Sequence, residues 1–318
     1  MRKHGLPSTD RPHDKYFKAV FSIAELAQEL LEFSLPPECL QILDTGSLSL
    51  ATDSFVDEHL RESFSDLIYQ ARLKTNRDIR ISFLFEHKSF PPAQPIQLQL
   101  LRYLGNIWET DLRQKRALRP VIPIVVYQGK TPWKKSSFAE QFPDLPEALL
   151  PYLPEFEYQF VNLGDITDEI LFSMNLGLIR NVLLAMKHAG EDDYIRHHFS
   201  QVVIFAKPDE TTEIVRFLFE TTLMYLQSVS AITKKEYKAM VTEQLPAELK
   251  KAALVLYEQI KLEGESAGLE QGLEQGLEQG KKEVIQTVLQ KHPEWTDVQI
   301  AELLDVPVAW VQDIRAQG

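Results

Sequence analysis

The sequence has little cysteine and no long hydrophobic run. Cys39 is the only cysteine among 318 residues, which excludes an internal disulfide and a cysteine-rich zinc site. No stretch reaches the roughly 18 consecutive apolar residues that a membrane-spanning helix needs. The first 17 residues also lack the apolar core of a signal peptide. These absences predict a cytoplasmic protein with no membrane partner.

The charge is unevenly distributed along the chain. The net charge is −12, which by itself argues against a nucleic-acid partner. Residues 61–135 nevertheless hold 14 Lys and Arg against 6 Asp and Glu, a balance of +8, so the remainder carries −20. A basic segment inside an acidic chain is compatible with a local phosphate-binding face. Simple solvation of loops such as 113–119 is the alternative explanation.

Hydrophobic periodicity predicts an α/β core in the first half of the chain. Asp14 is a plausible N-cap for a helix over 16–31, which Pro36 and Pro37 would stop. Two strands separated by the polar turn 74–78 form a predicted antiparallel hairpin. The further expected elements are a weak strand at 47–55, the hairpin strands at 64–73 and 79–87, a helix at 98–113, a buried strand at 121–127 and a strand within 156–162. Pro123 counts against a fully central position for the strand that contains it.

The second half of the chain reads as almost wholly helical. This order of elements predicts an α/β core with a helical extension. The predicted divisions are the core at 1–164, the helical extension at 165–264, a GLEQ repeat at 265–280 and a small helical tail at 281–318.

The GLEQ repeat and the tail carry no candidate chemistry. Three consecutive GLEQ units favour a helical linker or a self-association segment, although each glycine costs a helix about 1 kcal/mol relative to alanine. Self-association would make the protein a homo-oligomer, with a dimer as the simplest case. The spacing of apolar residues between Ile300 and Ile314 resembles a helix-turn-helix pair. Arg315 is the only basic residue on the second helix, so a structural or oligomerising tail is favoured over a DNA-reading one.

A carboxylate and an amine emerge together at the end of the second hairpin strand. Alternate residues of a strand share a face. Glu86 and Lys88 therefore point to the same side, about 7 Å apart along the backbone. Burial of either group is costly unless a partner compensates it. The other hairpin strand brings a second acid, Asp66, although acids are disfavoured in strands.

Two carboxylates that converge with a lysine suit phosphodiester hydrolysis. Carboxylates are the oxygen ligands that Mg²⁺ or Mn²⁺ prefers, and such a metal polarises the phosphoryl oxygen and acidifies water. The lysine would orient that water or neutralise developing charge. A plain salt bridge of Lys88 with Glu86 or Asp66 explains the same spacing, and it is the favoured interpretation of the pattern alone, with the metal site as the alternative.

A longer set of motifs runs through the chain, namely His13–Phe21, Ser54–Tyr69, Phe85–Ser89, Leu101–Leu104 with Ile107 and Trp108, and Val121–Gly129. Together these motifs resemble the recombination-promoting nuclease/putative transposase family, a branch of the PD-(D/E)XK nucleases. The resemblance covers roughly residues 10–205, and the tandem GLEQ units are also similar to repeats in many members.

The resemblance implies a restriction-endonuclease-like mixed sheet flanked by helices, and a metal-dependent DNA endonuclease linked to recombination or mobile elements. Asp66 matches the first strand acid, and Glu86 with Lys88 matches the acid-x-lysine pair. These three would be catalytic, with Asp66 and Glu86 holding Mg²⁺ or Mn²⁺. Many members have Gln at the position of Lys88, so the lysine favours an intact catalytic centre.

Four further residues are weaker candidates for supporting roles. Asp14 matches the acid that relatives often place on the first helix, although a helix cap is the favoured reading. Gln97 and Gln99 could support the metal or a phosphate, but the favoured interpretation is that they are polar side chains at the surface without such a role. Arg102 could contact phosphate or pair with Glu109. His87 lies between Glu86 and Lys88 but faces the other side, so packing is its expected role.

The leading hypothesis is therefore a DNA endonuclease. A catalytically inactive DNA-binding or assembly protein on a nuclease fold is the second hypothesis. A helical regulator that acts through residues 281–318 is the third.

Overall fold

The computed structural model describes residues 11–51, 67–75, 80–173, 177–205, 213–258 and most of 282–317. The chain divides into two compact units, Met1–Ala253 and Leu254–Gly318. Asp66 and the GLEQ repeat lie outside the described residues. Among the helices within the described ranges, none is both long and apolar enough to span a membrane.

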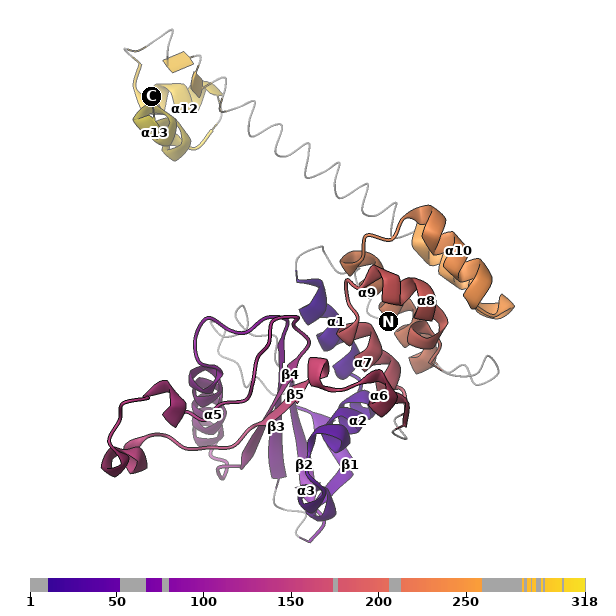
Figure 1. The fold of residues 1–318 in the computed structure, drawn as a ribbon. Coiled ribbons are helices and arrows are strands. Elements are labelled where there is room, and N and C mark those ends of the chain that lie inside the picture. Colours follow the sequence, from indigo (N-terminus) through magenta and orange to yellow (C-terminus); the bar gives the residue numbers. More distant parts are fainter. Residues whose placement is uncertain are drawn as a thin grey trace. The chain divides into compact units, whose positions relative to one another are not determined.

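The first unit is a mixed α/β structure in which helices flank a five-stranded sheet (Figure 1). Residues 247–253, the last of this unit, are helical as well. The elements in chain order are α1 (Pro12–Phe21), α2 (Ala24–Ser34), α3 (Pro37–Ile42), β1 (Leu43–Leu50), β2 (Leu67–Leu73), β3 (Arg80–Lys88), α5 (Ile96–Arg113), β4 (Val121–Tyr127), η1 (Ala139–Gln141), η2 (Glu147–Tyr152), β5 (Gln159–Asn162), η3 (Leu163–Asp165), α6 (Asp168–Ser173), α7 (Ile179–Lys187), α8 (Asp192–Val203), α9 (Glu213–Val229) and α10 (Lys234–Gln244).

The sheet has the strand order β1-β2-β3-β4-β5. β2 and β3 pair antiparallel, which confirms the predicted hairpin, and the described ladder begins where Leu67 faces Phe85. Helix α5 then connects β3 to β4, which runs parallel to it, and β5 is parallel to β4. The reading of Pro123 as a mark of a non-central strand is wrong, because β4 lies between two strands. The ladder with β5 starts at Ile124, one residue after the proline, which has no N–H to donate.

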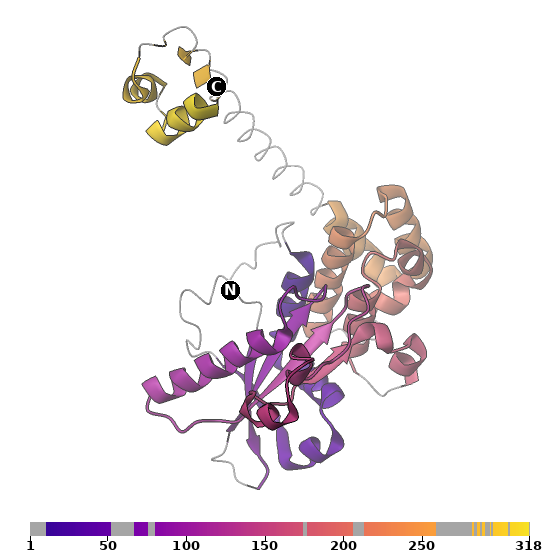
Figure 2. The same cartoon turned by 60° about the vertical axis from the view of Figure 1, so that its left-hand side comes forward.

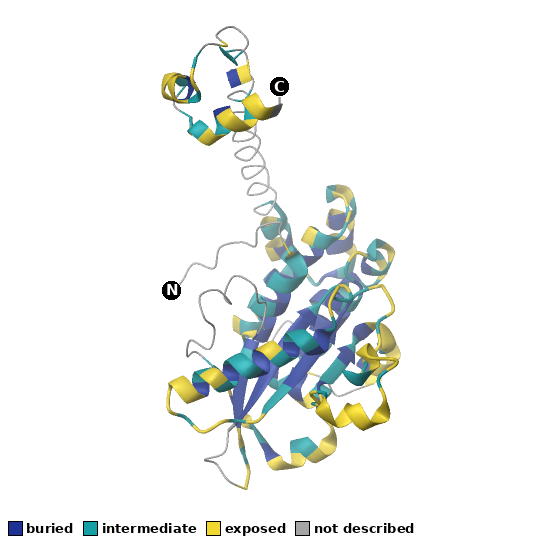
Figure 3. Ribbon diagram, turned by 90° about the vertical axis from the view of Figure 1, so that its left-hand side faces the viewer, coloured by how far each residue is buried: buried dark blue, intermediate teal, exposed yellow. Residues whose placement is uncertain are grey.

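Helices cover both faces of the sheet (Figures 2 and 3). On one face, Leu100 and Tyr103 of α5 pack with Leu84 and Val125 of the central strands. On the other face lie α1 and α2, where the Tyr69 hydroxyl donates to the Phe21 carbonyl oxygen over 2.8 Å. The central strand β3 is therefore buried on both sides, and residues 81–87 are all buried.

Three local predictions at the start of the chain are wrong. The single helix expected over 16–31 is two helices, because α1 ends at Phe21 and α2 begins at Ala24. Asp14 is not an N-cap, since α1 begins two residues earlier at Pro12. Proline is favoured there because the first turn does not need its missing N–H, and Pro37 begins α3 for the same reason. The first strand starts at Leu43, four residues before the predicted one.

A partly buried polar cluster ties α6, α7 and α8 together. The Asp168 carboxylate accepts hydrogen bonds from Lys187 Nζ and the Tyr194 hydroxyl, both at 2.6 Å. Its Oδ1 also lies 3.0 Å from His188 Nε2. Burial by itself raises the pKa of Asp168, but hydrogen bonds from Lys187, Tyr194 and His188 outweigh it and lower that pKa to about 2.

The second unit contains the predicted pair of tail helices, α12 (Asp297–Leu304) and α13 (Val308–Gln317). Thr296 is the cap, because its hydroxyl accepts from the Gln299 backbone N–H over 3.3 Å. The side chain of Arg315 donates to Asp297 and to the Trp295 carbonyl oxygen, each at 2.7 Å. Arg315, the one basic residue of α13, is thus engaged within its own unit.

Gly129 follows β4 at a position that has no room for a side chain. A Cβ there would overlap the Tyr127 hydroxyl and lie 2.5 Å from the Ser89 carbonyl oxygen. We predict that Gly129→Ala lowers the free energy of unfolding by about 1–3 kcal/mol through overpacking. The control is Gly105→Ala in α5, where a Cβ meets open space, and the helical alanine should add about 0.5–1 kcal/mol. Denaturant titration measures the free energy of unfolding of both variants. A change of the same sign in Gly129→Ala and Gly105→Ala would contradict this packing.

Asp168 should make stability depend on pH. A carboxyl whose pKa is lowered in the folded state stabilises the fold fully above its ordinary value of 3.8 and loses that contribution as pH falls toward about 2. Asp168→Asn should therefore lower the free energy of unfolding at pH 7 by about 2 kcal/mol. The difference from wild type should shrink between pH 4 and pH 2. Asp144→Asn, at an exposed loop position, should show neither effect in the same denaturation series.

Candidate functional site

Glu86 and Lys88 lie on one face at the end of β3, as the alternation of the strand predicts. Glu86 is only 2% exposed, whereas the Lys88 side chain is 20% exposed and reaches solvent. Lys88 Nζ is 2.6 Å from Glu86 Oε1. The ion pair between Lys88 and Glu86 that the spacing allowed is therefore formed, and its carboxylate is buried.

Gln99 also contacts Glu86, and it does so from the neighbouring layer. Its Nε2 donates to Glu86 Oε1 over 3.0 Å and to the Tyr103 hydroxyl over 2.6 Å. Helix α5 brings Gln99 to this place because it starts at Ile96 and packs across the sheet over Leu84. Both donors of Glu86 thus come to the same carboxylate oxygen.

The other oxygen of that carboxylate is left without a donor. Glu86 Oε2 is buried and has no hydrogen-bond partner among the described residues. A buried polar atom in this state costs about 1–3 kcal/mol, and more when the group is charged. Such atoms are rare in native proteins and call for an explanation such as a bound ion. A hard divalent cation takes carboxylate oxygens as ligands, so the donor set at Glu86 fits a metal on Oε2.

Asp66, the other predicted metal ligand, lies in residues 52–66, which are outside the described part of the chain. Asp66 directly precedes Leu67, and Leu67 pairs with Phe85, which directly precedes Glu86. Within the described ranges, no three His, Cys, Asp or Glu side chains form a group that could hold a metal ion. Glu86 is therefore the one predicted metal ligand whose surroundings can be read directly.

Asp14 lies on the opposite face of β3 from Glu86. Its Oδ1 is 2.8 Å from Nδ1 of His87, and successive residues of a strand point to opposite faces. The structure thus brings Asp14 to His87 and not to the carboxylate of Glu86. His87 is buried as expected, but polar contacts hold it in addition to packing.

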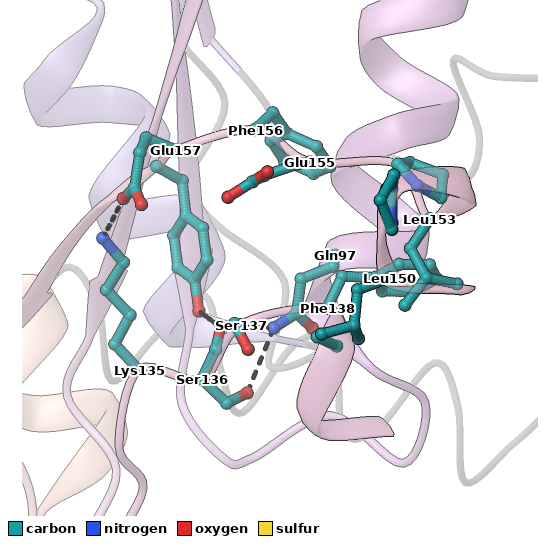
Figure 4. A pocket seen from close by; sticks show the side chains of 14 residues that line it. Gln97, Lys135, Ser136, Ser137, Phe138, Leu150, Leu153, Glu155, Phe156 and Glu157 are labelled. Carbon is teal, nitrogen blue, oxygen red and sulfur yellow. Dashed lines mark hydrogen bonds and ion pairs between the residues drawn. The ribbon is translucent and has the colours of Figure 1, made fainter. Parts of the chain in front are cut away.

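Gln97 and Gln99 reach different neighbours although only one residue separates them. Residues two apart on a helix do not share a face. Gln97 donates to the Ser136 carbonyl oxygen over 2.6 Å, and it lines a cleft of about 630 Å³ together with Ser136, Phe138, Phe156 and Tyr158 (Figure 4). The carboxylate of Glu157 near this cleft is bound by Lys135 at 2.6 Å. Gln97 thus belongs to the cleft, and Gln99 belongs to Glu86.

Arg102 is exposed on α5, three residues beyond Gln99. Residues at this spacing are neighbours on a helix surface. The alternative pairing of Arg102 with Glu109 is not formed, and Glu109 instead binds Arg113 over 3.0 Å. Arg102 thus presents a positive charge on the surface beside the Glu86–Gln99 contact.

One polar residue that contacts the back of the site was not among the predicted site residues. Gln128 follows β4 directly, and its Oε1 is 3.0 Å from His87 Nε2. Because 41 residues separate the two in the chain, no local pattern could pair them. The single available signal was the placement of a polar residue at the end of an apolar strand that is parallel to β3.

The fold and the site define a mixed α/β protein with an acid-x-lysine pair at the end of a central strand, in which the acid is buried and the lysine reaches solvent. Within that class, the chain belongs to the family described as "Putative transposase, YhgA-like", whose profile matches residues 11–215. This membership confirms the predicted family. No solved structure matches the chain.

Relatives of the chain include proteins named as nucleases and proteins named as inactive. "Recombination-promoting nuclease RpnD" of Escherichia coli O157:H7 is 29% identical over 195 residues, which cover 58% of this chain and 71% of that protein. "Recombination-promoting nuclease RpnC" of Escherichia coli K12 is 30% identical over 59% of this chain and 61% of its own length. "Inactive recombination-promoting nuclease-like protein RpnE" of Escherichia coli K12 is 24% identical over 83% of this chain and 86% of its own length.

Proposed function

We propose that this chain is a divalent-metal-dependent DNA endonuclease of the PD-(D/E)XK type, linked to recombination or mobile elements. One observation carries the proposal, namely the buried Oε2 of Glu86, which has no donor among the described residues and lies beside Lys88. In a family with members named as nucleases, an anionic oxygen held in this state is the place where Mg²⁺ or Mn²⁺ would bind.

Asp66 supplies the second metal-binding carboxylate in this proposal. The support is its place in the chain, since Asp66 and Glu86 each lie next to one member of the Leu67–Phe85 pair. When bound, a divalent cation acts as a Lewis acid toward the phosphoryl group and makes water more acidic.

The other residues of the site have separate roles. Gln99 orients the Glu86 carboxylate by donating to Oε1, so that Oε2 is the oxygen left for the metal. Lys88 holds a positive charge at the solvent-facing side of the pair, where it stabilises negative charge that develops on the phosphate. Arg102 adds a phosphate contact on the adjacent surface of α5.

A second function is supported by the relatives that are named as inactive. In that alternative, the Lys88–Glu86 ion pair is a permanent structural contact. The protein would then bind or assemble on DNA without cleaving it. Homo-oligomerisation through residues 265–280 stays a prediction in either case, because the repeat lies outside the described residues.

Cleavage of supercoiled plasmid tests the proposed activity. We expect nicking or linearisation with Mg²⁺ or Mn²⁺ that EDTA abolishes. Glu86→Gln, Asp66→Asn and Lys88→Met should each lower the rate by at least about 100-fold, as removal of a transition-state contact does. The matched control is Glu157→Gln, an exposed partner of Lys135, which should cleave like wild type.

The same assay separates the two functions. DNA binding that weakens with salt, in a wild-type protein that never cleaves with either metal, would select the inactive alternative. Full cleavage by Glu86→Gln would show that the activity resides elsewhere.

Arg102 should contribute one phosphate contact to DNA binding. In the presence of EDTA, Arg102→Ala should reduce the slope of log affinity against log salt by about 1. Arg113→Ala is the control, because Arg113 lies about 16 Å further along α5 by helical rise and pairs with Glu109. Equal slopes for wild type and Arg102→Ala, measured by fluorescence anisotropy, would remove Arg102 from the binding surface.

A further inference from the structure

The face of β3 opposite Glu86 carries a buried polar network. The His87 side chain is fully buried. Its Nδ1 is 2.8 Å from Asp14 Oδ1, and its Nε2 is 3.0 Å from Gln128 Oε1. The ring also stacks on Phe17 at a centroid distance of 5.1 Å. His87 is thus held by α1 on one side and by the end of β4 on the other.

The network extends from Gln128 into the helical layer. Gln128 Nε2 is 2.8 Å from His13 Nδ1 and donates to the Tyr225 hydroxyl over 3.0 Å. Tyr225, on α9, stacks against Tyr16 with parallel rings 4.1 Å apart. Four elements that are distant in sequence (α1, β3, β4 and α9) therefore meet through hydrogen bonds around one histidine.

Packing alone does not explain such a network. Apolar residues of similar volume often fill a buried site at least as stably as polar or charged ones do. What polar contacts add is a defined orientation, because each hydrogen bond fixes the partner in distance and angle. His87 gains that orientation at both ring nitrogens.

The strand transmits this orientation to the site. Glu86 and Lys88 are the two chain neighbours of His87, and they project to the other face. The backbone on this side is also tied to β4, because the Gln128 N–H donates to the Lys88 carbonyl oxygen over 3.0 Å. A change in the strand backbone at His87 would therefore alter the positions of the carboxylate and the ammonium group together.

We propose that His87, held by Asp14 and Gln128, is a positioning residue for the metal site of Glu86 and Lys88. This inference rests on the proposed function. It gives Asp14 a role different from that of a metal ligand, since Asp14 acts through His87 from the opposite face. Functional sites need their groups held within roughly 0.5 Å by supporting contacts, and loss of such support typically costs about 10–100-fold in metal affinity.

Calorimetric titration with Mn²⁺ alone, without DNA, tests the proposal. His87→Phe keeps a ring against Phe17 but loses both hydrogen bonds, and it should weaken Mn²⁺ binding about 10–100-fold. Asp14→Ala should act in the same direction. Asp14→Asn keeps an acceptor for His87 Nδ1, so its Mn²⁺ affinity should stay within about 3-fold of wild type, well short of that loss. DNA binding in EDTA should be unchanged in all three.

A control variant separates positioning from general destabilisation. Asp168→Asn removes the carboxylate from a second, partly buried histidine–carboxylate contact among the described residues of the same unit. It should lower stability and leave Mn²⁺ affinity as in wild type. A loss of Mn²⁺ affinity in this control equal to that of His87→Phe would reduce the network to a structural role.

The remaining outcomes are also distinct. Wild-type affinity in His87→Phe and Asp14→Ala would overturn the positioning role while the proposed metal site stands. A loss of Mn²⁺ affinity in Asp14→Asn as large as that in Asp14→Ala would indicate that Asp14 is a direct metal ligand. That result would also overturn the positioning role of His87. Absence of Mn²⁺ binding by the wild type would reject the proposed function and its positioning residue together. If His87→Phe does not fold, the comparison of the two Asp14 variants decides, because the Asp14 side chain is 25% exposed.

Discussion

The burial of β3 on both faces is the constraint on which the rest of the structure depends. A strand covered by α5 on one side and by α1 on the other has no water near its centre, so every polar side chain at its end must find a partner in protein. His87 finds partners on α1 and after β4. Glu86 finds Lys88 and Gln99, which both bind the same oxygen. Glu86 and His87 are adjacent in the chain but differ in one respect. Of these two residues, only Glu86 retains a buried side-chain atom without a donor.

This difference connects the fold to the chemistry. A protein selected for stability alone would fill the place of Glu86 with an apolar side chain, because a buried and partly satisfied carboxylate lowers the free energy of unfolding. Sites that carry such a cost are often functional ones, where activity is retained at the expense of stability. The sheet supplies the rigid support, α5 supplies Gln99, and the helical layer supplies the partners of His87. The site is therefore built from both layers, although its acid-x-lysine pair lies on one strand.

Much of the fold could be predicted from local patterns, but the contacts of the site could not. The hairpin of β2 and β3 follows from alternation and a polar turn, and α5 follows from its apolar periodicity. The break between Phe21 and Ala24 was missed because apolar residues continue across it. The place of Glu86 and Lys88 on one face needed only strand geometry. Their surroundings depend on contacts between distant segments, such as Asp14 with His87 across 73 residues, and one sequence does not reveal such contacts.

A crystal structure of the protein with Mn²⁺ tests the central claim most directly, because manganese can be located by its anomalous scattering. The account predicts a manganese peak about 2.1 Å from Glu86 Oε2, a distance usual for a small hard cation and oxygen. Lys88 and Gln99 should remain on Oε1. A structure with no manganese at Glu86, in which Oε2 instead accepts a hydrogen bond from a protein donor, would contradict the assignment of this carboxylate as a metal ligand.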